Sequence, residues 1–196
     1  MAQILYMDSA SSRSFFNGAS LSFGVFDGVH RGHRYLMSCA RETALHTGGK
    51  SVVLTFSIDP DELFAKDRLI KLLSNEERIK TLASCDVDYV AVLPFDREFA
   101  SLSPEAFLSW TFGDSAPSHI HVGKGFRFGC RASGTVDVLR CWGDTVGATV
   151  CDHELLEDNG IPISATRIRG LLSEQKVHQA ETLLGRSWKQ VGMIAC

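Results

Sequence analysis

The chain has 196 residues, of which 44% are hydrophobic and 22% are charged, and its formal net charge is −3. This length suits one α/β domain with a substantial core, and the composition excludes a disordered chain. The weak negative charge gives no sign of a broad basic surface of the kind that binds nucleic acid or anionic membranes. Binding of a polyphosphate would therefore depend on a few local donors.

The N-terminal residues include no basic segment followed by an apolar run, which is the pattern of a secretion signal. No apolar run in the sequence approaches the roughly 18 residues needed to span a membrane. Six cysteines are scattered along the chain without a C-x-x-C pair. We expect them to be small buried side chains in a reducing compartment, and the protein to be cytoplasmic.

Apolar runs bounded by glycine, proline or polar residues predict the strands of a buried sheet. In chain order these runs are residues 3–7, 21–26, 51–56, 87–93, 119–123 and 145–151. Helical spacing and capping residues predict the helices between them. The predicted helices begin near His33, at a Ser74-Asn75-Glu76-Glu77 capping box, at Ser103-Pro104, at Thr135 and after Ser164. Gly48 and Gly49 end the first of these helices.

The alternation of strands and helices predicts right-handed crossovers and a Rossmann-like, doubly wound parallel sheet in a single domain spanning residues 1–196. Ligands of such sheets bind at the carboxyl ends of the strands. The loops that follow the predicted strands should therefore converge on one cleft.

The most informative stretch is the turn at residues 23–33, which contains the pattern G-x-F-D-G-V-H-x-G-H. It follows a predicted strand and precedes a helix, where free backbone N–H groups and the helix dipole favour an anion. We expect Gly28 and Gly32 to let a ligand approach the backbone closely. We expect His30 and His33 to donate hydrogen bonds to phosphate oxygens.

A second anion site is predicted at residues 163–169, with the sequence I-S-A-T-R-I-R. Ser164 is suited to cap a helix, and the first amides of that helix, with Thr166, would face an anion beside Arg167 or Arg169. A capped surface helix with solvated arginines is the alternative, and this motif alone favours neither interpretation.

The glycine-rich loop at residues 123–129 alternates aromatic and cationic side chains. Phe126 or Phe128 is suited to stack on a planar ring, and Arg127 to reach a phosphate or the face of that ring. Alternatively the phenylalanines anchor the loop to the core, and we expect at least one of them to do so.

In this order the motifs resemble the FMN adenylyltransferase module of bacterial FAD synthetases, within the nucleotidylyltransferase superfamily. The resemblance covers residues 21–186. It rests on the histidine turn, on Thr55-Phe56 with Pro60, on Leu102-Ser103-Pro104-Glu105, on Val122-Gly123 followed by F-R-F-G, on T-R-I-R, and on Leu184-Gly185-Arg186.

The resemblance implies transfer of AMP from ATP to FMN, giving FAD and pyrophosphate, with Mg²⁺ as cofactor and no dedicated metal ligand among the residues. His30 and His33 would be the catalytic residues. The implied ATP-binding residues are Gly24, Phe26, Asp27, His30, Gly32, His33, Ser164, Thr166, Arg167 and Arg169. The implied flavin-binding residues are Asp59, Pro60, Gly125, Phe126, Arg127 and Phe128. The expected partners are these two small molecules, without nucleic acid or membrane.

Three positions differ from the family's usual pattern: Asp59 stands for a histidine, Gly125 for an Asn or Asp, and Ala165 for a serine. Members usually continue into a riboflavin kinase barrel, and we do not expect riboflavin phosphorylation from this sequence. The three differences keep two alternatives open. One is adenylyl transfer to another phosphorylated acceptor, such as a phosphopantetheine- or nicotinamide-mononucleotide-like one. The other is a non-catalytic protein that binds flavin or adenine nucleotide.

Overall fold

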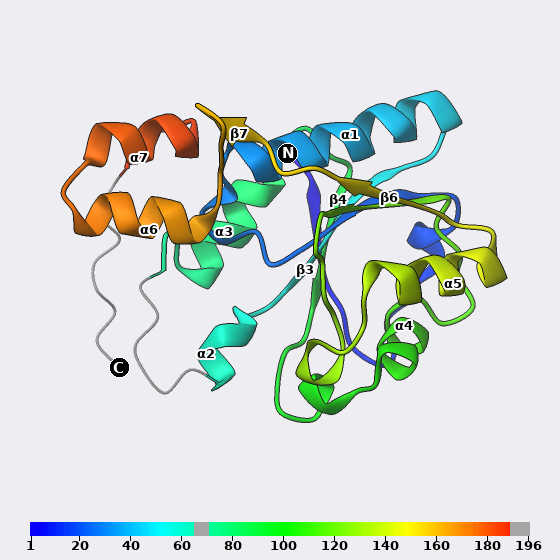
Figure 1. The fold of residues 1–196 in the computed structure, drawn as a ribbon. Coiled ribbons are helices and arrows are strands. Elements are labelled where there is room, and N and C mark those ends of the chain that lie inside the picture. Colours follow the sequence, from blue (N-terminus) through cyan, green and yellow to red (C-terminus); the bar gives the residue numbers. More distant parts are fainter. Residues whose placement is uncertain (65–70, 189–196) are drawn as a thin grey trace.

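The computed structural model describes residues 1–64 and 71–188 (Figure 1). In this part of the chain, six strands form one parallel sheet in the order β1-β4-β3-β2-β5-β6. The strands are β1 (Gln3–Tyr6), β2 (Ser20–Phe23), β3 (Ser51–Phe56), β4 (Tyr89–Leu93), β5 (His119–Gly123) and β6 (Thr149–His153). The predicted doubly wound α/β fold is confirmed.

The central strand β2 has β3 on one side and β5 on the other. Ser22 of β2, for example, is level with Val53 of β3 and with His121 of β5. The chain builds the sheet outward from β2 through β3 and β4, and then returns to add β5 and β6 on the opposite side. Strand order therefore reverses between β2 and β5, which is where sheets of this type open a crevice for ligands.

Helices cover both faces of the sheet (Figure 1). Helices α1 (Arg31–Thr47) and α3 (Asn75–Ala83) lie on one face, and α4 (Pro104–Phe112) and α5 (Val136–Val146) lie on the other. Alternate strand residues face the two layers: Val53 packs with α1 and α3, whereas its neighbour Leu54 packs with α4 and α5. Strands buried on both faces explain the continuous apolar runs of the sequence.

The C-terminal helices form a smaller unit beside the sheet, coloured orange to red in Figure 1. A short hairpin of β7 (Glu157–Asp158) and β8 (Ile161–Pro162) leads into α6 (Ala165–Ser173), and α7 (Val177–Leu184) packs against α6. Ile168 and Leu184 bury the contact between the two helices together with Leu72. The short helix α2 (Pro60–Phe64) follows β3.

Several predicted boundaries were wrong. β1 ends at Tyr6 rather than at residue 7, and β4 begins at Tyr89 rather than at residue 87. β2 ends at Phe23. The amide of Gly24 makes the last hydrogen bond between this segment and β3, and the chain then turns because Phe26 adopts a left-handed backbone conformation. The strand predicted at residues 145–151 begins only at residue 149 because α5 continues to Val146 and ends at Gly147, which has a positive φ. Thr135 caps α5 from outside the helix.

The cysteines are less buried than predicted. Cys39, Cys85, Cys130 and Cys151 are half-buried and Cys141 is exposed, because none belongs to the buried clusters of the core, and all five are free thiols. Cys196 lies outside the described residues. Among residues 1–64 and 71–188, no helix is both long and apolar enough to cross a membrane.

Replacing Ser74 with alanine should lower the free energy of unfolding by about 1 kcal/mol, measured by urea denaturation. Ser74 accepts a hydrogen bond from the amide of Glu77, and the Glu77 side chain accepts from the amide of Ser74, so both bonds of the predicted capping box are present. As a control, Ser173→Ala on the exposed end of α6 should change the stability by less than about 0.5 kcal/mol. Equal losses in the two variants would contradict the role of the cap.

Candidate functional site

A pocket of about 430 Å³ opens at the carboxyl ends of β2, β3, β5 and β6. Its walls come from four loops that follow these strands and from the first residues of α1 and α6. The predicted convergence of the loops on one cleft is therefore confirmed. Of the predicted site residues, those that line the pocket are Gly24, Phe26, Asp27, His30, Gly32, His33, Asp59, Pro60, Gly125, Phe126, Ser164 and Arg169.

The histidine turn has a strained backbone. Phe26 and Val29 have φ values of 61° and 43°, and Gly28 between them has a φ of 75°. Left-handed conformations are uncommon outside glycine and are outliers for a β-branched residue such as valine. Such strain is found where a functional geometry is held by the surrounding structure.

Both glycines of this turn make room for protein side chains, and Gly32 also lines the pocket. A Cβ atom on Gly28 would lie 2.7 Å from the Leu72 side chain, and one on Gly32 would lie 3.2 Å from the ring of His30. The carbonyl of Gly28 also accepts a hydrogen bond from Arg186, at 3.3 Å. The turn is thus packed against the C-terminal unit.

His30 and His33 lie with stacked rings, whose centroids are 3.5 Å apart. The His33 amide donates to Nδ1 of His30 at 3.3 Å, so the proton of the neutral His30 ring lies on Nε2. Nδ1 of His33 is buried without a partner in the described structure, which likewise favours a proton on its Nε2. Phe26 packs edge-on against His33 at 5.2 Å.

Burial keeps both imidazoles neutral. Desolvation lowers the pKa of His30 to about 4, and desolvation together with the neighbouring His30 lowers the pKa of His33 well below its usual value. Both rings are therefore neutral donors near pH 7. An anion placed against them would favour the charged form and raise their pKa.

An ion pair between Asp27 and Arg169 joins the turn to α6. Nη2 of Arg169 lies 2.5 Å from Oδ2 of Asp27, and Oδ1 of Asp27 accepts from the amide of Leu72 at 3.3 Å. Burial raises the pKa of Asp27, and the positive charge of Arg169 opposes this effect. The pair therefore places one guanidinium at the wall of the pocket beside the histidines.

The first turn of α6 forms the wall next to the histidine turn. Ser164 caps the helix by accepting from the amide of Arg167 at 3.2 Å, as predicted. Thr166 is exposed, and Arg167 donates at 2.7 Å to the carbonyl of Ile161 in the β7–β8 hairpin, so neither lines the pocket. The structure thus directs Arg169, rather than Arg167, toward the pocket.

The predicted acceptor side is largely apolar. Phe126 lies 4.8 Å from Phe23 between ring centroids, and both line the pocket. Phe128 is buried against Phe107, which is the core-anchoring role expected for one of the two phenylalanines. Arg127 is exposed and does not line the pocket.

Asp59 provides the one buried carboxylate of the acceptor side. Its Oδ1 accepts from the amide of Asp61 at 3.0 Å, so it caps the short helix α2. Desolvation raises its pKa, and the negative charge of Asp27 contributes to the same direction.

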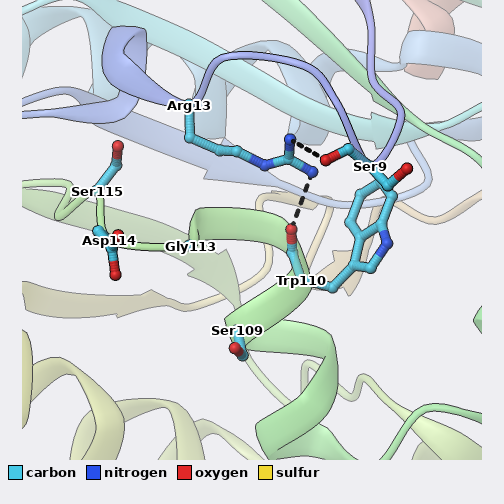
Figure 2. A pocket seen from close by; sticks show the side chains of 7 residues that line it. All are labelled: Ser9, Arg13, Ser109, Trp110, Gly113, Asp114 and Ser115. Atoms are coloured by element: carbon cyan, nitrogen blue, oxygen red, sulfur yellow. Dashed lines mark hydrogen bonds between the residues drawn. The ribbon is translucent and has the colours of Figure 1, made fainter.

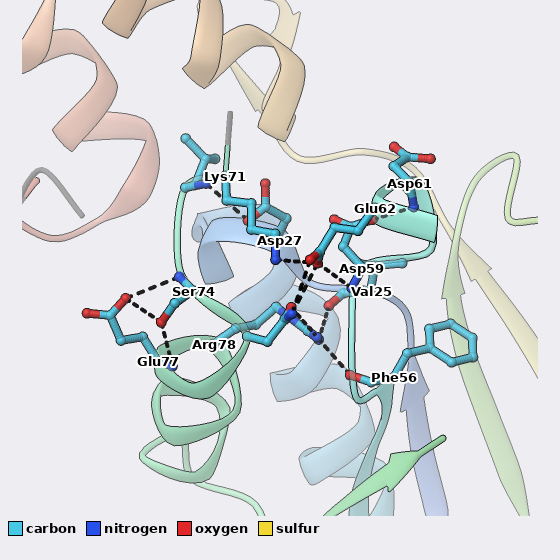
Figure 3. Close-up of polar contacts among 12 residues, drawn as sticks. Val25, Asp27, Phe56, Asp59, Asp61, Glu62, Lys71, Ser74, Glu77 and Arg78 are labelled. Atoms are coloured by element: carbon cyan, nitrogen blue, oxygen red, sulfur yellow. Dashed lines mark hydrogen bonds and ion pairs between the residues drawn. The ribbon is translucent and has the colours of Figure 1, made fainter. Parts of the chain in front are cut away.

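Sequence reasoning missed Arg78, which is 1% exposed and holds two loops of the pocket together (Figure 3). Nη1 donates to the carbonyl of Val25 at 2.8 Å and to the hydroxyl of Thr55 at 2.7 Å, and Nη2 donates to the carbonyl of Phe56 at 2.7 Å. A signal was present, because Arg78 lies four residues before Leu82 on the apolar face of α3.

A network continues from Arg78 into the acceptor loop. Asn75 accepts from Arg78 at 3.3 Å and donates to Glu62 at 3.1 Å, and Glu62 accepts from the amide of Asp59 at 2.9 Å. Lys71 forms an ion pair with Glu62. The carboxyl ends of β2 and β3 are thereby fixed from beneath the pocket.

A second hollow, of about 460 Å³, lies away from these groups, between the loop after β1 and the end of α4 (Figure 2). Arg13 stacks over the ring of Trp110 at 5.1 Å and donates to the carbonyls of Ser9 and Trp110. Its guanidinium is engaged in holding backbone, so we assign no site there.

Comparisons with known proteins agree with this geometry. A family model described as FAD synthetase matches residues 12–167. The bifunctional riboflavin kinase/FMN adenylyltransferase of Escherichia coli (strain K12) is 34% identical over 183 residues, which cover 90% of this chain and 57% of that protein. The protein of the same name from Haemophilus influenzae is 31% identical over 183 residues, covering 90% of this chain and 58% of that protein. The chain thus spans less than three-fifths of these curated relatives.

Solved structures show the same fold. A structure named macrolide-efflux protein, from Streptococcus pneumoniae, has a TM-score of 0.78 and 25% identity, and the match covers 96% of this chain and 63% of that one. A pantothenate synthetase from Thermus thermophilus has a TM-score of 0.51 and 14% identity, with 93% and 80% of the two chains covered. The second likeness concerns the fold alone.

Replacing Arg78 with methionine should lower the free energy of unfolding by about 3 kcal/mol, because it leaves buried carbonyl groups without donors. Arg78→Lys should cost less, since its ammonium group keeps the charge but cannot reach all three acceptors. Urea denaturation of both variants measures the difference. A methionine variant as stable as the wild type would contradict the proposed bracing of the two loops.

The free energy of unfolding should rise as the pH increases from about 4 to 6.5. In this window the unfolded state binds a proton at His30 that the folded state does not, because the folded pKa is the lower one. Lowering the pKa of His30 from 6.5 to about 4 corresponds to about 3 kcal/mol.

The raised pKa values of Asp27 and Asp59 make the free energy of unfolding fall as the pH rises. Comparison with a His30 variant therefore isolates the contribution of the histidine. In His30→Gln the rise in stability between pH 5 and 7 should be smaller than in the wild type, measured by urea denaturation at each pH. His46→Gln, on the exposed last turn of α1, should keep the wild-type slope. Equal slopes in all three proteins would contradict the assignment.

Proposed function

The chain belongs to the FAD synthetase family, and from this premise we propose that it transfers the adenylyl group of ATP to the phosphate of FMN, giving FAD and pyrophosphate. The observation that carries the proposal is that two elements suited to bind phosphate line the same pocket. The histidine turn forms one wall, the capped first turn of α6 with Arg169 forms the next, and aromatic rings close the acceptor side.

In this reaction an oxygen of the FMN phosphate attacks the α-phosphorus of ATP, and the bond to the β-phosphate oxygen breaks as pyrophosphate leaves. No covalent nucleophile is needed, because positioning and charge stabilisation supply the catalysis. Nε2–H groups of His30 and His33 would donate to the phosphate oxygens. The free amides at the start of α6 and the guanidinium of Arg169 would bind the leaving pyrophosphate.

The neutrality of the free histidines suits this role. A triphosphate beside them raises their pKa, so they gain positive charge only when the ligand is in place. Because the two imidazoles are desolvated, each donor is worth more there than in water.

A divalent cation is generally required for ATP-dependent transfer, and we propose Mg²⁺ here. Within residues 1–64 and 71–188, no cluster of three or more ligating side chains is present. This fits Mg²⁺, which is commonly held by substrate phosphates, water and one or two carboxylates. Asp59 and Asp27 are the pocket carboxylates that would hold it, and burial raises the pKa of both. The cation would neutralise charge on the phosphates.

The family differences affect the acceptor side and α6 rather than the histidine turn. Gly125 has a φ of 77° and open space where a side chain would lie, and Ala165 lies at the pocket without a hydroxyl group. Asp59 is occupied in part as the cap of α2. We therefore propose FMN as the acceptor on family membership and on the aromatic wall of Phe23 and Phe126.

One assay tests the proposal: purified protein is incubated with ATP, Mg²⁺ and FMN, and both FAD and pyrophosphate are followed. Formation of FAD supports it. Release of pyrophosphate only with another phosphorylated acceptor would replace FMN by that acceptor. ATP binding without turnover on any acceptor would identify a non-catalytic nucleotide-binding protein and overturn the proposal.

His33→Ala should lower the rate of FAD formation by at least about a hundredfold, because it removes a donor to the reacting phosphates. The thermal midpoint should stay close to that of the wild type, since His33 is half-buried and carries an unpaired nitrogen. His46→Ala, on the same helix but outside the pocket, is the matched control and should retain full turnover. An unchanged rate in His33→Ala would refute the role of the turn.

A further inference from the structure

A row of histidines lies beside the pocket on the sheet face that α1 covers. On β5, His119 and His121 alternate with Ile120 and Val122, which belong to the core cluster on the opposite face. His153 ends the neighbouring strand β6. The rings of His121 and His153 are stacked, with centroids 5.1 Å apart, and Nδ1 of His121 lies 2.8 Å from Nε2 of His153.

The burial of His121 determines which nitrogens carry protons. His121 is 3% exposed, and desolvation lowers its pKa to about 4, so it is neutral with one ring proton. Its Nε2 is buried without a partner in the described structure. A proton there would be a buried N–H group with no acceptor, which costs free energy, whereas a proton on Nδ1 is used in the bond to His153. His121 therefore donates through Nδ1.

This arrangement fixes the tautomer of His153. Since Nε2 of His153 accepts the bond from His121, the proton of its neutral ring lies on Nδ1. Nδ1 has no hydrogen-bond partner within residues 1–64 and 71–188, and His153 lines the pocket. Tyr35 of α1 packs edge-on against the same ring at 6.0 Å and lines the same wall. His153 thus brings to the pocket wall a ring N–H donor that has no partner among the described residues and that the phosphate chemistry does not use.

The position of this donor indicates the part of the ligand that it meets. The phosphate-binding groups lie at the histidine turn and α6, and the aromatic acceptor wall lies at Phe23 and Phe126. The remaining wall is formed by Tyr35, His153 and Leu155, with an ion pair of Lys124 and Glu154 at 2.6 Å. If the acceptor occupies the aromatic wall, this remaining wall is left for the base of the nucleotide.

We propose that His153 donates a hydrogen bond from Nδ1 to a ring nitrogen of adenine, and that His121 is the positioning residue that holds His153 in this tautomer. The proposal rests on the proposed function, because it takes ATP as the nucleotide. Adenine offers unprotonated ring nitrogens as acceptors, and the ring of Tyr35 next to His153 is suited to the flat face of a base.

A pair of substitutions separates the two nitrogens of His153. The amide nitrogen of asparagine can take the place of Nδ1, whereas that of glutamine takes the place of Nε2. His153→Asn should therefore keep the donor to the base, and His153→Gln should lose it. We expect the KM for ATP to rise about five- to tenfold in His153→Gln and in His153→Ala, and about twofold or less in His153→Asn. The KM for FMN and kcat should stay within about twofold of the wild type in all three.

The role of His121 is tested with His121→Phe, which keeps the ring volume and removes the donor to His153. The KM for ATP should rise about threefold without a change in kcat, and adding His153→Ala to this variant should have no larger effect than His153→Ala alone. His119→Ala, on the same strand but outside the pocket, is the matched control and should keep the wild-type KM. Thermal midpoints of all variants show whether each is folded.

Ligand analogues identify the acceptor atom. Among 1-deaza-, 3-deaza- and 7-deaza-ATP, one should bind the wild type about five- to tenfold more weakly than ATP does, and His153→Ala should abolish that difference. Equal KM values for ATP in the wild type and His153→Gln, or a rise in the KM for FMN instead, would overturn the proposal.

Binding of α,β-methylene-ATP, measured by calorimetry, separates this test from the proposed function. A wild type that forms no FAD but binds the analogue more tightly than His153→Gln would contradict the reaction and support the donor. A wild type that forms FAD and binds the analogue no better than His153→Gln would contradict the donor alone.

Discussion

The ion pair of Asp27 and Arg169 is the contact on which the architecture of the site depends. It joins the turn after β2 to a helix 142 residues later in the chain, and its second carboxylate oxygen holds the segment that leads into α3. Both charges are taken largely out of water, which is favourable only when each has its partner. The sheet and the C-terminal helices are packed around this point, so the histidine turn and the first turn of α6 form adjoining walls of the pocket.

Around that contact, burial disfavours the charged forms of the ionisable groups in the pocket. Burial lowers the pKa of His30 and His33 and raises the pKa of Asp27 and Asp59. A site of this kind is prepared for a ligand that brings its own charge, because a polyphosphate with its cation restores the charge balance that burial removed. The strained turn and the buried guanidinium of Arg78 hold this arrangement before any ligand arrives.

The predicted acceptor side is built from different groups. Its surface is made by aromatic rings, and its single buried carboxylate also caps a short helix. In the proposed function such a wall would select a planar substrate by shape and stacking more than by charge. The histidine row on β5 and β6 adds a directional donor on the opposite wall.

Local patterns in the sequence were sufficient to predict the sheet, most helix starts, and the helix caps at Ser74, Ser103 and Ser164. These features depend on period, capping and turn chemistry, all of which act over a few residues. The predicted boundary was wrong where a helix continued into an apolar run, as α5 does up to Val146. A short apolar run is compatible with a helix as well as with a strand.

Only the tertiary structure decided which arginine of the T-R-I-R motif faces the pocket, and that Gly28 and Gly32 make room for Leu72 and His30. The tertiary structure also places Arg78 beneath the loops that follow β2 and β3, and it places His121 against His153. Each of these contacts joins residues that are far apart in the chain. Burial then limits an arginine or histidine side chain to the few hydrogen-bond partners around it, so that it becomes an oriented donor. The sequence determines the chemistry that is available, and packing decides which of it the pocket uses.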